Sequence, residues 1–257
     1  MSKLDDLKAK LATRQPVLST TIVNLSWTGI IQKASAFAFD MMMFDLEHGT
    51  LSVETVEGLL RMCRMCDLPS VVRVPDCVPH LISKTLDMGA DGILIPRVER
   101  MEQVETAIRC ARYYPRGRKG CGGFSNLRAE DEGNLEKYND NRLIFIQMES
   151  NEGLAILPEI LETYGKELAG VLIGPYDASI MIGTPLDIMS EAMTEYIRKV
   201  FAICNDYDIS CGSFVDGPEL FARYRELGGN VYWTGADIGM LCTGFKVTCD
   251  AFKEEIK

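Results

Sequence analysis

The chain has 257 residues, of which 47% are hydrophobic and 25% charged, and its formal net charge is −10. That length suits one (β/α)₈ barrel, and the composition is that of a globular protein rather than a disordered one. The acidic excess argues against a nucleic-acid partner, whose phosphates require a basic surface. It leaves an anionic substrate open, because a few arginines in a cleft set the local field.

Nothing near the start of the chain predicts export or a membrane partner. Residues 1–15 mix charges at helical spacing and lack an apolar core, and the longest apolar runs elsewhere are too short to span a bilayer. Nine cysteines in such a chain are typical of reduced thiols, so we expect a cytoplasmic protein. Cys63 and Cys66 form a C-x-x-C inside an apolar helical stretch, without a second pair at zinc spacing, which favours core packing.

Strand-like runs alternate with helical runs, and no linker divides them. This pattern predicts an α/β fold, a single TIM-barrel domain over residues 1–257 with an extra N-terminal helix at about 2–15. Strands are expected at 17–25, 41–47, 70–75, 92–98, 143–150, 168–177, 209–215 and 230–237. Helices are expected at 52–66, 78–89, 100–114 and 242–256, and a loop at 115–142. A doubly wound open sheet is the alternative, but no G-x-G-x-x-G follows the first strand.

Polar residues interrupt the apolar pattern at several predicted strand ends. In a TIM barrel the C-terminal ends of the strands carry the chemistry, so we expect these side chains to converge on one rim. They are Asp45, Glu47 and His48 on the second strand, Arg73 on the third, Gln147 and Glu149 on the fifth, Asp177 on the sixth and Asp237 on the eighth.

Glu149 and Asp177 are the candidate metal ligands. Gln147 and Glu149 are two residues apart on one strand, so both point to the same face. Two carboxylates from neighbouring strands, with the other positions left to water and substrate, suit Mg²⁺ or Mn²⁺. The alternative is that both acids cap the helices that follow them.

His48 and Arg73 are the candidate catalytic residues. His48 is one of two histidines, and Asp45 lies close enough in the chain to orient its ring, although a structural role is the alternative. Arg73 interrupts an apolar strand and needs an anionic partner, either a structural Asp or Glu or a substrate oxygen. No predicted strand contains a lysine, which favours a metal over a Schiff base as the electron sink.

Several segments resemble the HpcH/HpaI aldolase family, in the family's order and over residues 17–250. They are F-D-L-E-H-G (44–49), V-V-R-V-P (71–75), L-D-M-G-A-D-G-I-L-I-P-R-V-E (86–99), Q-M-E-S (147–150), I-G-P-Y-D (173–177) and T-G-A-D-I-G (234–239). Members such as 4-hydroxy-2-oxoheptane-1,7-dioate aldolase are metal-dependent class II pyruvate aldolases. The resemblance implies reversible cleavage of a 4-hydroxy-2-oxo acid to pyruvate and an aldehyde through an enolate. The alternatives are a related citrate-lyase-like enzyme or oxaloacetate-type decarboxylase, and a non-catalytic barrel that binds a metabolite.

The resemblance also implies a role for each matched residue. Glu149 and Asp177 would hold Mg²⁺, Mn²⁺ or Co²⁺, which pyruvate chelates. Gln147 and Arg73 would contact the keto-acid oxygens, with Arg73 stabilising the enolate. His48, oriented by Asp45, would be the acid and base.

Three further features follow from the same resemblance. The backbone at Gly174 and Pro175 would receive the substrate carboxylate. Phe214 stands where family members often carry a smaller aliphatic residue that lines the aldehyde pocket. The family is typically a homo-oligomer, a hexamer in which the last helix is exchanged between neighbours.

Overall fold

Eight parallel strands close into a barrel in the computed structural model, which describes residues 2–256. Each strand pairs with the next, and β8 pairs back onto β1. The strands are β1 Val17–Ile22, β2 Met41–Asp45, β3 Ser70–Arg73, β4 Gly92–Ile95, β5 Leu143–Gln147, β6 Gly170–Ile173, β7 Cys211–Val215 and β8 Val231–Ala236. Each lies within its predicted run, so the TIM barrel is confirmed.

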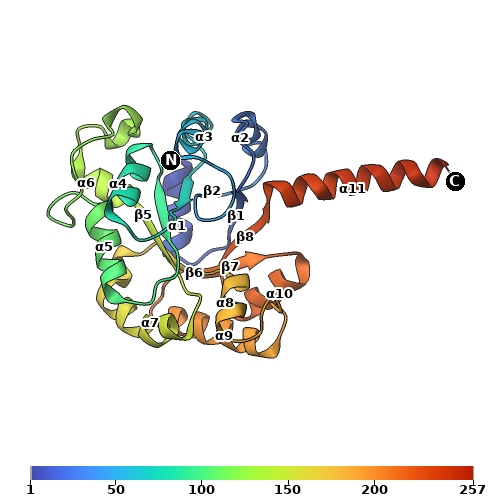
Figure 1. Ribbon diagram of the computed structural model, residues 1–257. Helices are drawn as coiled ribbons and strands as arrows, with labels where there is room; N and C mark the ends of the chain where they lie inside the picture. Colours follow the sequence, from blue (N-terminus) through green and yellow to red (C-terminus); the bar gives the residue numbers. More distant parts are fainter. Residues whose placement is uncertain (1, 257) are drawn as a thin grey trace.

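Helices surround this barrel, and one precedes it (Figure 1). They are α1 Lys3–Ala12, α2 Gly29–Ala34, α3 Val53–Met65, α4 Pro79–Asp87, α5 Met101–Ala111, α6 Leu135–Asn141, α7 Asn151–Tyr164, α8 Pro175–Met181, α9 Glu191–Asp206, α10 Pro218–Glu226 and α11 Asp237–Ile256. The extra N-terminal helix is confirmed as α1. None of the helices within residues 2–256 is long and apolar enough to cross a membrane.

Several predicted boundaries were wrong, among them the start of the last helix, which begins at Asp237 instead of residue 242, and the end of the fifth strand, which stops at Gln147 instead of residue 150. The segment 115–142 is not all loop, because α6 occupies its end, with Asn134 as the N-cap that accepts a hydrogen bond from the Lys137 backbone N–H at 2.9 Å. The sixth strand ends at Ile173 instead of reaching Asp177. Pro175 starts α8, since its fixed φ suits the first position of a helix and it has no N–H to leave unpaired.

The hydrophobic core has two parts. One lies between the strands and the surrounding helices, and Cys63 packs there with Cys66 beside it, as expected from the C-x-x-C. The other fills the barrel, where Leu4, Leu7 and Leu11 of α1 pack against inward-facing strand residues. The N-terminal helix therefore closes one end of the barrel and leaves the C-terminal end for the site.

Strand alternation carries the polar residues to that open end. Met41 and Met43 of β2 belong to the barrel interior, and Asp45, two residues further on, continues the same inward row. In the same way Val71 precedes Arg73 on β3, and Phe145 precedes Gln147 on β5. These polar side chains form the last inward layer above the apolar interior.

The last helix extends away from the barrel, and the C-terminus lies at its far end (Figure 1). Its first residue still contributes to the barrel, because the Asp237 carboxylate accepts hydrogen bonds from the backbone N–H groups of Asn24 and Leu25, at 2.9 and 2.6 Å. Asp237 thus fastens the segment after β1 instead of joining the cavity described below.

Candidate active site

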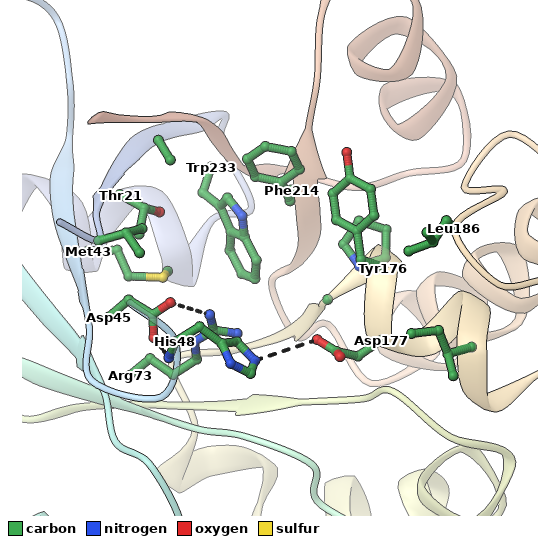
Figure 2. A pocket seen from close by; sticks show the side chains of 15 residues that line it. Thr21, Met43, Asp45, His48, Arg73, Tyr176, Asp177, Leu186, Phe214 and Trp233 are labelled. Atoms are coloured by element: carbon green, nitrogen blue, oxygen red, sulfur yellow. Dashed lines mark hydrogen bonds and ion pairs between the residues drawn. The ribbon is translucent and has the colours of Figure 1, made fainter. Parts of the chain in front are cut away.

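A cavity of about 390 Å³ lies at the C-terminal ends of the strands. Figure 2 shows its two sides, with Asp45, Arg73, His48 and Asp177 on one and Trp233, Phe214 and Tyr176 on the other. The cavity is lined by Thr21, Val23, Met43, Asp45, His48, Arg73, Gly174, Pro175, Tyr176, Asp177, Ile180, Leu186, Phe214, Trp233 and Ala236. Most of the site residues predicted from the sequence are therefore brought together, from four different strands or the segments that follow them.

Asp45 and Arg73 form a bidentate ion pair. They are register partners on β2 and β3, and the Arg73 Nε and Nη2 groups donate to the two Asp45 carboxylate oxygens at 2.9 and 2.5 Å. Burial disfavours the charge on Arg73, but the hydrogen bonds and charge of Asp45 outweigh it and raise the pKa of the guanidinium. The sequence left open whether Arg73 pairs with an acid of the protein or with a substrate oxygen. In the structure its partner is the Asp45 carboxylate.

Asp45 does not orient the His48 ring, contrary to the prediction. Its Oδ1 accepts from the backbone N–H of His48 at 3.2 Å, so it fixes the turn and not the imidazole. The His48 Nε2 atom lies 3.7 Å from Glu47 Oε2. It also lies 4.0 Å from Asp177 Oδ2 (Figure 2). Strand pairing explains the difference, because it sets Arg73 directly beside Asp45. The ring is thus turned towards the candidate metal ligand.

Glycine at position 49 permits this turn after β2. Gly49 has φ +108°, and a Cβ there would clash with the Val23 backbone. The sharp bend directs His48 over the cavity, where its side chain is 57% exposed. The imidazole is therefore accessible to a bound substrate.

Glu47 belongs to the site, although the sequence interpretation gave it no role. It lies 3.2 Å from Arg73 Nη1 through Oε2 and 3.2 Å from Arg97 Nε through Oε1. Burial raises its pKa, against the opposing charges of Arg73, His48 and Arg97. Its spacing of two from Asp45 was the available signal, since such residues share a face of an extended strand.

Glu149 and Gln147 lie just beneath the cavity. The Gln147 side-chain amide donates to Glu149 Oε1 at 2.6 Å, and both side chains are buried. A Cβ at position 174 would clash with these same two side chains, so only glycine allows β6 to pass so close to them. Burial, followed by repulsion from Asp177 and Glu47, raises the pKa of Glu149 to about 8.

The residues present fit a divalent cation. Glu47, Glu149 and Asp177 make this end of the barrel acidic, and Glu47 Oε2 and Gln147 Oε1 are buried without a hydrogen-bond partner. Hard oxygen donors of this kind are what Mg²⁺ and Mn²⁺ take. Within residues 2–256 no three His, Cys, Asp or Glu side chains form a ready-made metal cage. A cation held by two carboxylates needs its remaining positions filled by water and substrate.

The alternative that Glu149 and Asp177 only cap helices is not supported by a capping hydrogen bond from either side chain, although Asp177 lies where the dipole of α8 favours an acid. Helix α7 is capped by Ser150, whose side chain accepts from the Gly153 N–H at 3.2 Å. Helix α8 begins after Gly174 without a side-chain cap, and Asp177 lies inside its first turn. Asp177 therefore projects from the start of a helix towards His48, while Glu149 lies beneath it.

Comparisons with known proteins agree with this fold and site. The family model HpcH/HpaI aldolase/citrate lyase matches residues 21–243. The hydroxypyruvate/pyruvate aldolase of Roseovarius nubinhibens is 31% identical over 207 residues, which cover 79% of each chain. The 4-hydroxy-2-oxo-heptane-1,7-dioate aldolase of Escherichia coli is 30% identical over 225 residues, 84% of each chain.

A solved structure extends the similarity of fold to almost the whole chain. The HpcH/HpaI aldolase from Desulfitobacterium hafniense matches with a TM-score of 0.88 at 22% identity and covers 96% of both chains. At that identity the match shows the fold alone. Together these findings define a TIM barrel with an acidic site at its C-terminal rim. The chain belongs to the HpcH/HpaI aldolase/citrate lyase family.

Proposed function

We propose that the protein is a divalent-metal-dependent pyruvate aldolase, which reversibly cleaves a 4-hydroxy-2-oxo acid to pyruvate and an aldehyde. The observation that carries the proposal is the approach of His48 Nε2 to within 4.0 Å of Asp177 Oδ2, in a cavity that Arg73 also lines. A proton-transfer group, a cationic group and a carboxylate cluster thus border the same space. The names of the relatives support an aldolase acting on a 2-oxo acid.

Removing a proton from the pyruvate methyl group develops negative charge on the keto oxygen. A divalent cation held by Glu149 and Asp177 would supply a Lewis acid for that charge. Arg73 is oriented by Asp45 and Glu47, so its guanidinium is ready to donate to the same oxygen or to the carboxylate without moving. Gln147, which donates to Glu149 beneath the cavity, is the proposed contact for the keto-acid oxygens on the buried side.

His48 is the group that we assign to proton transfer. It is exposed to the cavity, so its imidazole can take a proton from the pyruvate methyl group and, in the cleavage direction, from the 4-hydroxyl group. The carboxylates of Glu47 and Asp177 lie 3.7 and 4.0 Å from its Nε2 atom. Backbone at Gly174 and Pro175, where α8 begins, is the proposed contact for the substrate carboxylate.

The test is exchange of the pyruvate methyl protons in D₂O, followed by NMR, together with pyruvate release from a 4-hydroxy-2-oxo acid. Both should be lost in protein treated with a chelator and restored by Mg²⁺, Mn²⁺ or Co²⁺. Undiminished exchange after the metal has been removed would contradict the proposal. Release of CO₂ from a 2-oxo diacid faster than any aldol cleavage would identify a decarboxylase instead.

We further propose that the chain forms a homo-oligomer, a hexamer by family resemblance. Support comes from the exposed apolar side chains along the extended helix α11, among them Phe245 and Phe252. Light scattering after size exclusion should give a mass several times that of the chain, and Phe245→Asp with Phe252→Asp should lower it to the monomer's. A monomeric wild-type protein would contradict this.

Because the cysteines of the protein are all free thiols, we also propose a reducing cytoplasmic location.

A further inference from the structure

We infer that Arg97 is a positioning residue of this site, whose backbone N–H fixes the Glu149 carboxylate and whose guanidinium fixes the orientation of Glu47. The inference rests on the proposed function, because Glu149 is the proposed cation ligand and Glu47 lies beside the proposed acid–base group. Arg97 follows β4 and does not itself line the cavity, so it acts through these two acids.

The backbone of Arg97 has a conformation that residues with a side chain seldom adopt. Its φ is +47°, in the left-handed region where a Cβ is crowded, so the surrounding contacts must hold it in place. The Gln103 side-chain amide donates to the Arg97 carbonyl oxygen at 3.1 Å. The next residue, Val98, donates its backbone N–H to the Gln147 carbonyl oxygen at 3.0 Å. The turn after β4 is thus fixed on the C-terminal side of the strained residue.

This conformation directs the Arg97 backbone N–H at Glu149. The N–H donates to Glu149 Oε2 at 3.3 Å, and the Gln147 side-chain amide donates to Oε1 at 2.6 Å. Each carboxylate oxygen therefore accepts one hydrogen bond, and the two donors together fix the plane of the carboxylate. An ionised carboxylate has two acceptor sites on each oxygen, so one site on each remains for a cation. Hydrogen bonds of this kind orient the groups that ligate a metal.

The guanidinium of Arg97 holds the second acid. Its Nε atom lies 3.2 Å from Glu47 Oε1, and its Nη2 group donates to the Pro75 carbonyl oxygen at 3.3 Å, so the side chain is fixed at two points. With Oε1 held in this way, Glu47 presents Oε2 to Arg73 Nη1 at 3.2 Å and to His48 Nε2 at 3.7 Å. Arg97 therefore determines which Glu47 oxygen faces the groups that are proposed to act on the substrate.

The same contact limits how strongly Glu47 competes with a substrate for Arg73. The Nε and Nη2 groups of Arg73 donate to Asp45, so pyruvate must use the N–H groups that remain. Glu47 lies beside those at Nη1. Without Arg97, both oxygens of Glu47 would be able to turn to Arg73, and pyruvate would bind more weakly.

All of these contacts lie within one chain. The Arg97 side chain is 57% exposed at the rim of the barrel, where a neighbouring copy has room to cover it in an oligomer. The contacts to Glu47, Glu149 and Pro75 do not require that exposed part to stay free. The experiments use the full-length protein in the oligomeric state that it adopts.

The first test isolates the backbone with two variants that remove the same charge. Arg97→Asn introduces a residue type that tolerates the left-handed conformation, whereas the β-branched side chain in Arg97→Val disfavours it. Mn²⁺ is titrated into the metal-free protein and followed by calorimetry, without pyruvate. Arg97→Val should bind Mn²⁺ about tenfold more weakly than Arg97→Asn, the usual effect of a lost partner to a metal ligand. Equal affinity in the two variants would overturn the role given to the backbone.

The second test isolates the guanidinium. In protein saturated with Mn²⁺, Arg97→Gln should raise the Kd for pyruvate by about fivefold or more, a coupling usual within one ion-pair network. Arg97→Lys keeps the positive charge and should recover part of the affinity. In a Glu47→Gln background the change from Arg97→Gln should fall below about twofold, because the competing carboxylate is gone. The same rise in both backgrounds would show that Arg97 does not act through Glu47.

Arg109→Gln is the matched control for charge and exposure. The Arg109 side chain lies near the end of α5, is 60% exposed and pairs with Glu105 at 3.6 Å. Its replacement removes the same charge from the surface without touching Glu47 or Glu149. The Mn²⁺ and pyruvate affinities of this variant should equal those of the wild type.

The wild-type protein distinguishes the possible failures. If it binds Mn²⁺ and pyruvate and exchanges the methyl protons, but the Arg97 variants behave like Arg109→Gln, then Arg97 is not a positioning residue and the proposed function stands. If it binds neither ligand and exchanges no protons, the proposed function fails and the role of Arg97 fails with it. Weaker Mn²⁺ binding in Arg97→Val than in Arg97→Asn, with a pyruvate effect that Glu47→Gln abolishes, supports both.

Discussion

Two clusters of buried charge lie at opposite ends of the barrel. Their carboxylates differ in how many hydrogen bonds they accept from the protein. At the N-terminal end, Asp91 accepts hydrogen bonds from Arg128 Nε at 2.6 Å and Nη2 at 2.9 Å, and also from the Ser70 backbone N–H at 3.0 Å. Nearby, Asn141 and Arg142 donate to the two oxygens of Asp131 at 2.6 and 2.5 Å. These acids are fully engaged by the protein itself.

At the C-terminal end the balance is different. Asp45 is engaged by Arg73, but Glu47 Oε2 is buried without a hydrogen bond, and the acids outnumber the cations that reach them. Burial would raise the pKa of Asp91, yet Arg128 holds it below the usual value, whereas burial and neighbouring acids raise the pKa of Glu149 to about 8. The first cluster is complete as a structural element, and the second has room for a cation.

The first cluster also explains the segment 115–142. Arg128 lies in that segment, and through Asp91 it fastens the segment to the start of β4. In a TIM barrel the N-terminal face contributes to stability, whereas the C-terminal face carries the chemistry. Replacing a carboxylate by its amide should therefore change the stability of the protein in opposite directions at the two ends. Asp91→Asn should lower it, whereas Glu149→Gln should remove a loss of stability at high pH.

The largest effect on stability is expected for Asp91→Asn. It removes the buried, bidentate partner of the Arg128 guanidinium, which keeps only the more exposed carboxylates of Asp67 and Glu130, at 3.4 and 3.9 Å. Breaking a buried pair in this way costs about 3–5 kcal/mol. Urea denaturation should register this loss. Glu130→Gln is the control, because Glu130 is exposed and lies 3.9 Å from the same guanidinium. A loss below about 1 kcal/mol for Asp91→Asn would show that the two clusters do not differ as described.

The next effect concerns the chemistry. His48→Ala should reduce exchange of the pyruvate methyl protons by about 10²-fold or more, the usual contribution of a general acid–base group. The side chain is exposed, so the free energy of unfolding should hardly change. NMR in D₂O measures the rate, and His80→Ala, the other histidine, serves as the control. Exchange at the wild-type rate in His48→Ala would show that another group moves the proton.

The smallest effect is expected for Glu149→Gln on the metal-free protein. Folding raises the pKa of Glu149 to about 8. The stabilising contribution of this group is therefore complete at a pH below its pKa in the unfolded chain, and it is lost as the pH rises towards 8. The wild-type protein should therefore lose stability from pH 6 to pH 8, by at most about 1.4 kcal/mol per pH unit from this group. The amide variant should lack this loss. Urea denaturation at the two pH values, in the presence of chelator, measures the difference, and an equal slope in both proteins would contradict it.

The sequence was sufficient for the barrel and for the residues that end its inward rows. Alternation on β2, β3 and β5 placed Asp45, Arg73 and Gln147 on one face, and the family resemblance is confirmed by the match over residues 21–243. These inferences depend on local periodicity and on strand order, both of which can be read along the chain.

Partners across strands could not be predicted in the same way. Asp45 pairs with Arg73 and not with the His48 ring, because strand register brings Arg73 beside it from a position 28 residues away. The start of α8 at Pro175 was missed because the preceding apolar run continues the strand pattern into a helix turn. Phe214 was singled out from the sequence, but its neighbours Tyr176 and Trp233 were not, since the three rings meet only after the barrel has closed.

Titration of Mn²⁺ into chelator-treated protein, with pyruvate present and binding followed by calorimetry, tests the central claim most directly. We predict one site per chain in the wild-type protein, and affinity reduced about 10²-fold or more in Glu149→Gln and in Asp177→Asn. Glu152→Gln, an exposed acid in the first turn of α7, should bind Mn²⁺ as the wild type does. Equal Mn²⁺ affinity in all four proteins would contradict the assignment of Glu149 and Asp177 as the residues that hold the cation.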